Sequence, residues 1–300
     1  MRFAVLASPE SWYLKDLCRA AAGRHELVAV AFSDLTATLG NNSASIASGL
    51  VALESMDAVI VRTMPPGSLE QVVFRMDALA RLENAGTVVV NPPKAVEAAV
   101  DKYLTSARLA AAGLKVPKTI VCQTADAAML AFAELGGDVV LKPLFGAEGR
   151  GIARLTDEAL ALRAFKMLEQ LGAVLYLQEF IRHEGADLRL LVIGHRVLGM
   201  RRRNPLDWRT NVSRGATPEP LEVTQELADL AHRAAASVGA TVAGVDLLPG
   251  CDGELYAIEV NAVPGWKALA RVHGVDVARL VLDYVTGLCE VNFRSRNRPS

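Results

Sequence analysis

Apolar positions along the chain recur with two different spacings. Short apolar runs predict buried strands, and longer segments with apolar residues three and four positions apart predict helices. In the first hundred residues the predicted strands are 3–7, 27–32, 58–61 and 87–90, and the predicted helices are 11–22 and 69–85. Residues 33–49 are rich in Ser, Asn, Thr and Gly and predict a loop with at most a short helix. Alternating strands and helices favour a parallel sheet with both faces covered.

The same two spacings continue through the rest of the chain. The predicted strands are 119–123, 138–144, 152–155, 174–181, 188–193, 196–200, 241–248 and 255–261. The predicted helices are 102–112, 125–135, 157–171, 224–238 and 275–288, and the polar end at 294–300 is expected to fray. The first layer resembles a Rossmann fold, but its first turn at 7–10 lacks GxGxxG, so dinucleotide binding there has little support.

Composition and charge narrow the class of protein. The chain is 51% hydrophobic and carries a formal net charge of −1, which argues against bulk electrostatic binding to nucleic acid or to a membrane surface. No apolar run approaches the roughly 20 residues that cross a bilayer. The four cysteines are widely spaced, without zinc or CxxC spacing, so we expect a reduced, cytoplasmic chain.

Two carboxylates and an amide lie on the hairpin predicted at 241–261. Side chains alternate on a strand, so Glu259 and Asn261 should share one face while Ile258 and Val260 share the other. The hairpin can bring Asp246 beside them, and oxygen ligands of this kind suit Mg²⁺ or Mn²⁺. A solvent-facing polar side of an antiparallel pair is the alternative.

Lys142 ends an apolar strand and precedes a glycine-rich turn at 145–151. A lone Lys in such a strand must reach solvent or an anion, and glycine backbone can approach phosphates closely. An ordinary hairpin turn would give the same pattern, and Lys102 taken alone fits a surface lysine. The strand at 175–181, followed by Asp187, could be plain core or could border a nucleotide.

Five arginines and one acid lie between Arg201 and Arg214. Arginine binds carboxylate and phosphate in a bidentate manner. A solvated basic loop and a nucleic-acid patch are the alternatives, and the latter has only Trp208 for stacking.

Taken in order, these pieces resemble the ATP-grasp superfamily and, within it, the RimK-like amino-acid ligases. The motifs that carry the resemblance are Asp101-Lys102, Leu141-Lys142-Pro143 with Gly146 to Gly151, Gln178-Glu179-Phe180-Ile181, Asp187-Leu188-Arg189, Arg209-Thr210-Asn211 to Gly215, Gly244-Val245-Asp246 and Glu259-Val260-Asn261 with Pro264-Gly265. Thr210 and Ser213 depart from the family pattern, in which Ser and often His are expected. The segments at 62–75 and 91–93 look closest to the tetrahydromethanopterin:α-L-glutamate ligases.

The resemblance implies an α/β fold of the α+β clamp type. Residues 1–95 would form a Rossmann-like pre-ATP-grasp layer, 96–180 the small lobe and central region, 181–290 the large lobe, and 291–300 a flexible tail.

The resemblance also implies a role for each matching residue. Those expected to bind ATP are Lys102, Lys142, Gly146, Gly149, Gly151, Gln178, Glu179, Phe180, Ile181, Asp187, Arg209, Thr210 and Asn211. Asp246, Glu259 and Asn261 would bind two Mg²⁺ (or Mn²⁺) ions, and Arg189, Arg203, Asn211 and Arg214 would face the phosphoryl group and the carboxylates. Arg62, Arg75 and Ser213 are expected at the acceptor.

The implied activity is ATP-dependent ligation of L-glutamate to an acceptor carboxylate, through an acyl phosphate, by a cytoplasmic homo-oligomer. A tetrahydromethanopterin-type cofactor is the favoured acceptor; a ribosomal protein C-terminus and another carrier protein are the alternatives. A nucleotide-binding regulator without catalysis and an RNA-binding protein are the alternatives of other classes.

Overall fold

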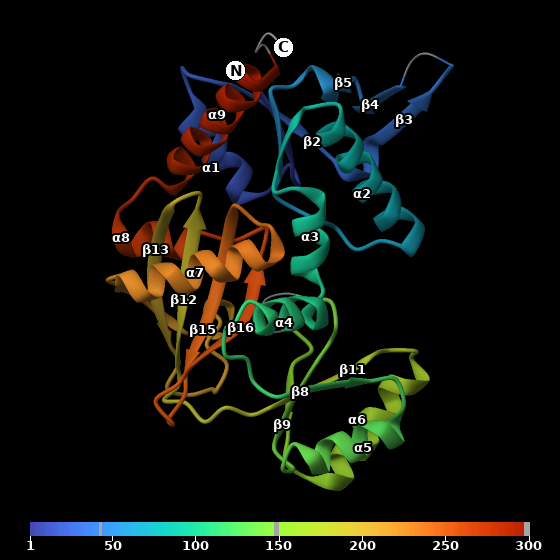
Figure 1. Ribbon diagram of the computed structural model, residues 1–300, viewed down its shortest axis with the longest axis vertical. Helices are drawn as coiled ribbons and strands as arrows, with labels where there is room; N and C mark the ends of the chain where they lie inside the picture. Colours follow the sequence, from blue (N-terminus) through green and yellow to red (C-terminus); the bar gives the residue numbers. More distant parts are fainter. Residues whose placement is uncertain (42–43, 147–149, 297–300) are drawn as a thin grey trace.

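The computed structural model describes residues 1–41, 44–146 and 150–296. It consists of an N-terminal layer, a small lobe and a large antiparallel sheet that lies between them (Figure 1). The α/β fold with an ATP-grasp-like clamp is therefore the architecture that the sequence predicted.

The N-terminal layer is a parallel sheet with the strand order β2-β1-β6-β7. Alternate residues of β1 face opposite sides: Phe3 and Val5 pack with α1, whereas Ala4 and Leu6 pack toward α2. Burial of both faces explains why β6 and β7 are apolar throughout and why β1 is apolar after Arg2. The elements are β1 (Arg2–Leu6), α1 (Trp12–Ala21), β2 (Glu26–Val30), β6 (Ala58–Val61), α2 (Leu69–Asn84) and β7 (Val88–Val90).

The prediction of a loop at 33–49 is wrong. This segment forms β3 (Leu35–Leu39) and β4 (Ala44–Ser48), which pair with each other and with β5 (Val51–Ala52) beside the parallel sheet. Ile46 is buried in the core, and the Ser48 hydroxyl exchanges hydrogen bonds with the backbone of Ala31. Tertiary contacts thus stabilise strands that the Ser- and Thr-rich composition did not favour.

The small lobe is an antiparallel sheet with the strand order β10-β9-β11-β8, packed against α5 and α6. Its elements are β8 (Thr119–Cys122), α5 (Ala125–Glu134), β9 (Val139–Lys142), β10 (Ala153–Leu155), α6 (Glu158–Gln170) and β11 (Leu175–Glu179). Two helices, α3 (Pro93–Val100) and α4 (Lys102–Ala111), connect it to the N-terminal layer; of these, the sequence predicted only α4.

The large sheet has the strand order β14-β13-β12-β15-β16 and is covered by α7 on one face. Its elements are β12 (Ala186–Ile193), β13 (Arg196–Arg203), β14 (Thr217–Leu221), α7 (Gln225–Val238), β15 (Val242–Pro249) and β16 (Leu255–Asn261). The chain then forms α8 (Lys267–His273) and α9 (Val277–Arg296), and α9 packs beside α1. The flexible tail predicted from residue 291 is therefore helical as far as Arg296.

The N-terminal layer and the large sheet share their hydrophobic cores. One cluster joins Leu6 and Leu79 to Val245, and a second joins Phe3 to Trp266 and Val281. The small lobe has a core of its own around Phe165. Among the helices of the described ranges, none combines the length and apolar character that crossing a membrane requires.

Asn91, directly after β7, joins the N-terminal layer to the large sheet. Its Nδ2 donates to the carbonyls of Val242 (2.7 Å) and Ala262 (2.5 Å). Its Oδ1 accepts from the backbone N–H groups of Thr241 (2.8 Å) and Val242 (3.0 Å). Asn91 is only 2% exposed, so water cannot replace these bonds if the side chain is lost.

We predict that Asn91→Ala lowers the free energy of unfolding by about 3 kcal/mol or more, because buried backbone groups lose their partners. Urea unfolding followed by circular dichroism measures this. Asn292→Ala, which removes one hydrogen bond to Gly86 at a half-buried position, serves as a control with an expected loss of about 1 kcal/mol. Equal losses in the two variants would contradict the role given to Asn91.

Candidate active site

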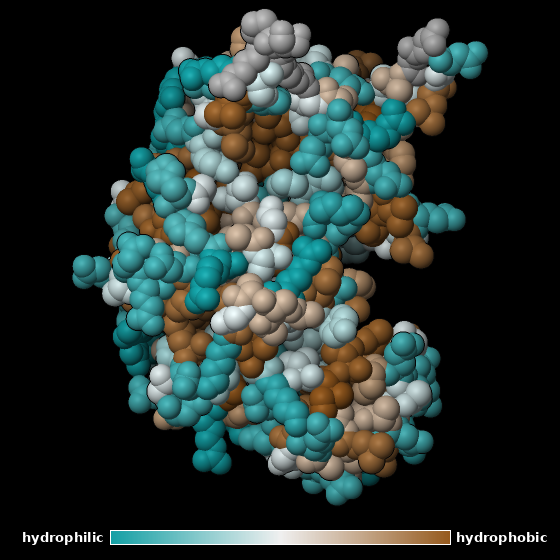
Figure 2. All heavy atoms as spheres, viewed as in Figure 1, coloured by the Kyte–Doolittle hydropathy of each residue, from teal (hydrophilic) through white to brown (hydrophobic). Residues whose placement is uncertain are grey.

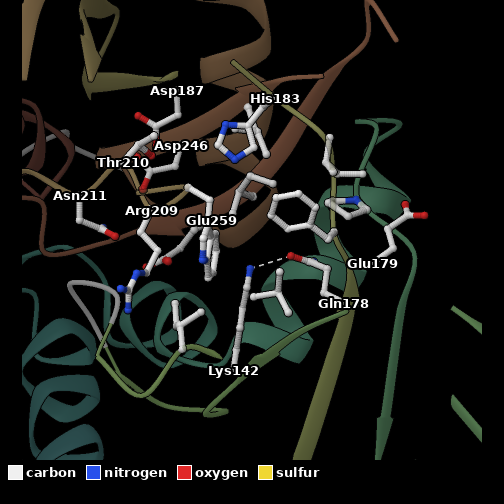
Figure 3. A pocket seen from close by; sticks show the side chains of 18 of the residues that line it. Lys142, Gln178, Glu179, His183, Asp187, Arg209, Thr210, Asn211, Asp246 and Glu259 are labelled. Carbon is white, nitrogen blue, oxygen red and sulfur yellow. Dashed lines mark hydrogen bonds between the residues drawn. The ribbon is translucent and has the colours of Figure 1, made fainter. Parts of the chain in front are cut away.

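A pocket of about 790 Å³, partly open to solvent, lies between the small-lobe sheet and the large sheet (Figure 3). The small lobe and the residues that follow β11 contribute Val140, Lys142, Ile152, Gln178, Glu179, Phe180 and Ile181. The large sheet and its loops contribute Asp187, Arg202, Trp208, Arg209, Thr210, Asn211, Asp246, Leu248, Ile258 and Glu259, and Pro117 and His183 complete the lining. In the space-filling view, the molecule is hollowed between the N-terminal layer and the small lobe (Figure 2).

Lysine side chains provide positive charge on the small-lobe side. Lys142 Nζ donates to Gln178 Oε1 at 2.6 Å, and Gln178 is held in turn by Thr119 and Tyr176. Burial lowers the pKa of Lys142 to about 8, which Glu259 and Asp246 only partly offset. Lys102 Nζ donates to the carbonyl of Gly146 at 2.7 Å, so it lies at the edge of the glycine-rich loop. An anion in the pocket would favour the charged form of both lysines.

The large sheet places two carboxylates opposite each other. Asp246 on β15 and Glu259 on β16 are direct cross-strand partners, as the hairpin predicted. The next pair is Leu247 with Ala257, so Ile258 is an additional residue in a β-bulge. Ile258 therefore borders the pocket together with Glu259, and the strict alternation expected from the sequence is wrong at this position.

Arginines compensate the buried acids. Asp246 Oδ1 is 2.7 Å from Arg189 Nη1 and 3.2 Å from Arg202 Nη2. Arg202 also holds Asp187 in a bidentate pair. The pKa of Asp246 is lowered because Arg189 and Arg202 outweigh its burial, whereas burial raises the pKa of Asp187 despite Arg202. Gly244 allows this arrangement, since a Cβ there would lie 2.4 Å from Cζ of Arg189.

The donor set at the bulge fits a hard divalent cation. No described residue donates a hydrogen bond to the Glu259 carboxylate, and burial and the charge of Asp246 raise its pKa. A bound cation would favour the ionised form of Glu259 beside Asp246. Within the described ranges, no group of three or more His, Cys, Asp or Glu side chains could hold a metal ion. Asn261, two residues after Glu259 in β16, is not part of the pocket lining, and its amide oxygen accepts from Val263 N–H at 2.8 Å.

The pocket brings together much of the set predicted from the sequence. Lys142, Gln178, Glu179, Phe180, Ile181, Asp187, Arg209, Thr210, Asn211, Asp246 and Glu259 all line it. Lys102 and Arg189 are not part of this lining, but both lie within electrostatic reach of Glu259. The Glu179 carboxylate instead points away from the pocket and accepts from Lys118 N–H (2.6 Å), so only its backbone and stem remain for a ligand (Figure 3). The backbones of Gly146 and Gly151 both lie close to the Pro143 ring, and Gly149 lies outside the described residues.

Other predicted residues lie elsewhere. Arg203 is exposed on the opposite face of β13, where it pairs with Glu219 at 3.7 Å, and its neighbour Arg202 enters the pocket instead. Arg214 and Ser213 are exposed in a short 3₁₀ turn, residues Val212–Arg214, outside the pocket lining.

Arg62 and Arg75 are buried, contrary to their predicted role at the acceptor. Arg62 donates to the carbonyl of Pro264 at 2.7 Å, and Arg75 donates to that of Pro65 at 2.8 Å. Both guanidinium groups thus hold backbone within the protein.

Sequence reasoning missed Arg202, His183, Trp208 and the apolar lining formed by Val140, Ile152, Leu248 and Ile258. Side chains alternate along β13, so Arg202 and Arg203 must face opposite sides of the sheet. The sequence alone does not show which of the two faces the pocket. The apolar residues come from both sheets and form a slot in which a planar ring could be held.

The chain was compared with known proteins. A family model described as a RimK-like ATP-grasp domain matches residues 99–285. The tetrahydromethanopterin:α-L-glutamate ligase of Methanosarcina acetivorans is 31% identical over 318 residues, covering 94% of this chain and 98% of that protein. The glutamate–LysW ligase ArgX of Sulfurisphaera tokodaii is 29% identical over 240 residues, covering 78% of this chain and 83% of that protein.

A solved structure has the same architecture over nearly the whole chain. The ATP-grasp ligase PsnB, complexed with a minimal precursor, superposes with a TM-score of 0.75 at 26% identity, covering 95% of this chain and 98% of that chain. A second structure of PsnB, with a TM-score of 0.72, contains Mg and ADP. Together with the family model, which matches more than half of the residues, these relatives show that the chain belongs to the RimK-like ATP-grasp family of ATP-dependent ligases that form carbon–nitrogen bonds.

Proposed function

We propose that this ligase adds L-glutamate to the carboxylate of a tetrahydromethanopterin-type carrier, with ATP converted to ADP and phosphate. The observation that carries the proposal is a pocket in which Lys142 faces Asp246 and Glu259, in a chain that matches a tetrahydromethanopterin:α-L-glutamate ligase over 94% of its length. We also propose the cytoplasmic location and the homo-oligomeric state that the sequence predicted.

The pocket offers a place for each part of ATP. The apolar slot and the backbone of Gln178 to Ile181 would take the adenine, and Asp187 the ribose hydroxyls. Lys142, Lys102 and Arg209 would neutralise the phosphates, and Lys102 already contacts the Gly146 carbonyl at the start of the glycine-rich loop. Lys142, Gln178 and Asp187 belong to packed strands, so this part of the site is formed before the ligand arrives.

The chemistry requires positioning and charge stabilisation more than covalent participation by the protein. An oxygen of the acceptor carboxylate attacks the γ-phosphorus, giving ADP and an acyl phosphate. The neutral amine of glutamate then attacks the acyl carbon and loses a proton, and inorganic phosphate leaves. Arg189 and Arg202, already directed at the Asp246 carboxylate, would hold anionic charge near the transferred group.

Asp246, Glu259 and Asn261 are the residues that would hold Mg²⁺ or Mn²⁺, and we propose two ions. Bound there, the metal would offset the negative charge on the phosphates and on the two carboxylates. The cross-strand pairing of Asp246 with Glu259 supports this assignment, because it brings two carboxylates together at the pocket.

A carrier protein is the second candidate acceptor. The glutamate–LysW ligase ArgX favours it, at 29% identity over 78% of this chain. We propose it second because the identity and coverage of ArgX are lower than those of the tetrahydromethanopterin:α-L-glutamate ligase.

Mass spectrometry of the products tests the proposed function. We expect one added glutamate on a tetrahydromethanopterin acceptor after incubation with ATP, Mg²⁺ and glutamate, and no product without ATP. A glutamate added instead to a carrier protein, or to a ribosomal protein C-terminus, would transfer the assignment to that acceptor. Glu259→Gln provides the matched inactive control.

We predict that nucleotide affinity falls as the pH rises through about 8. The pKa of Lys142 is about 8 in the free protein, so its positive charge is present below that pH and lost above it. The dissociation constant of ADP, measured by calorimetry in the presence of EDTA, should rise about tenfold between roughly pH 7.5 and 9.5. Lys142→Arg, which stays charged, should bind with little pH dependence; an equal fall in this variant would assign the effect to another group.

We predict that Asn261→Ala weakens Mn²⁺ binding to the ADP complex by about tenfold or more, because it removes an oxygen ligand. Electron paramagnetic resonance of free Mn²⁺ measures the binding without turnover. Asn292→Ala serves as the control for an Asn lost elsewhere, and unchanged Mn²⁺ affinity in Asn261→Ala would remove Asn261 from the metal site.

A further inference from the structure

The segment that follows Asn261 is held at several positions by residues from outside the large sheet. Asn91 donates to the carbonyl of Ala262 (2.5 Å), and Arg62 donates to that of Pro264 (2.7 Å). Both donors belong to the N-terminal layer, yet the segment begins at Asn261, at the end of β16. The position of this backbone therefore depends on the N-terminal layer.

Arg62 is enclosed where it meets the segment. Its guanidinium lies 4.2 Å from the ring centroid of Trp266 and 4.9 Å from that of Tyr13, and the side chain is 7% exposed. Burial lowers its pKa to about 10, which leaves it charged at neutral pH. Cation–π contacts to two rings, with a hydrogen bond to a carbonyl, fix the guanidinium in one orientation.

Side chains of α1 pack closely against the end of the segment, at Gly265 and Trp266. Trp266 is completely buried, and its Nε1 donates to Asp16 Oδ2 at 2.9 Å. At Gly265, a Cβ would lie 2.4 Å from the Tyr13 hydroxyl, so the α1 side chain packs directly on the backbone. The Arg62 Nε is buried and has no hydrogen-bond partner among the described residues, so the contacts of this side chain come from its other guanidinium nitrogens and from the two rings.

We propose that Arg62 is a positioning residue, which orients Asn261 for metal binding by fixing the Pro264 carbonyl. This rests on the proposed function, in which Asn261 is a metal ligand. The N-terminal layer thereby sets the geometry of a metal ligand that belongs to the large sheet, three residues before the carbonyl that Arg62 holds.

The test measures Mn²⁺ affinity separately from nucleotide affinity. Arg62→Met should raise the Mn²⁺ dissociation constant of the ADP complex about tenfold, the size typical of lost support behind a metal ligand. The ADP dissociation constant measured in EDTA should stay within about twofold, since Arg62 does not line the nucleotide pocket. Arg62→Lys, which keeps one charged donor, should recover part of the affinity.

Controls separate this role from its alternatives. Arg24→Met removes an exposed ion pair with Asp283 (2.9 Å) in the same layer and should change neither constant. If Arg62→Met binds Mn²⁺ normally while Asn261→Ala does not, the positioning role is wrong, and a raised KM for the acceptor would return Arg62 to the acceptor site. Normal Mn²⁺ binding in Asn261→Ala would instead contradict the metal assignment. Where Arg62→Met does not fold, Arg62→Lys gives the same test, with an expected threefold loss.

Discussion

Two carboxylates placed opposite each other on adjacent strands determine how the rest of the pocket is built. Asp246 and Glu259 would repel each other strongly away from water, so the fold must bring cations to them. Those cations come from separate parts of the chain: Arg189 from β12, Arg202 from β13, Lys102 from α4 and Lys142 from the small lobe. The pocket exists only where these elements converge, which explains why the lobes must pack as they do.

Much of this arrangement could be predicted from residue order. The strands of both sheets except β14, and the pairing of Asp246 with Glu259, follow from apolar runs and from a hairpin with a Gly-rich turn. The family motifs are local, and a local motif keeps its structure when the surrounding loops change. Placement of Lys142 beside Gln178 did not follow from residue order, because it depends on the pairing of β9 with β11, which are separated in the chain by β10 and α6.

The remainder depends on contacts between distant residues. The bulge at Ile258 changes which side chains reach the pocket. The sequence of β16 does not show that β15 has no partner residue for Ile258, so the bulge could not be predicted. The same limit applies to Arg202 and Arg203, where a shift of one position exchanges the two faces. β3 and β4 form in a segment of loop-like composition because Ile46 is buried in the core and Ser48 accepts a hydrogen bond from Ala31 N–H.

The way the small lobe is connected has a consequence for how such proteins can diversify. Its entry and exit lie side by side, because the Glu179 N–H donates to the Lys118 carbonyl at 2.9 Å, and its core is its own. Such a unit can be exchanged between related chains without breaking packing elsewhere. The N-terminal layer has no such freedom, because its apolar residues complete the interior of the large sheet. Recombination can therefore replace the small lobe as a module, whereas the N-terminal layer and the large sheet must change together.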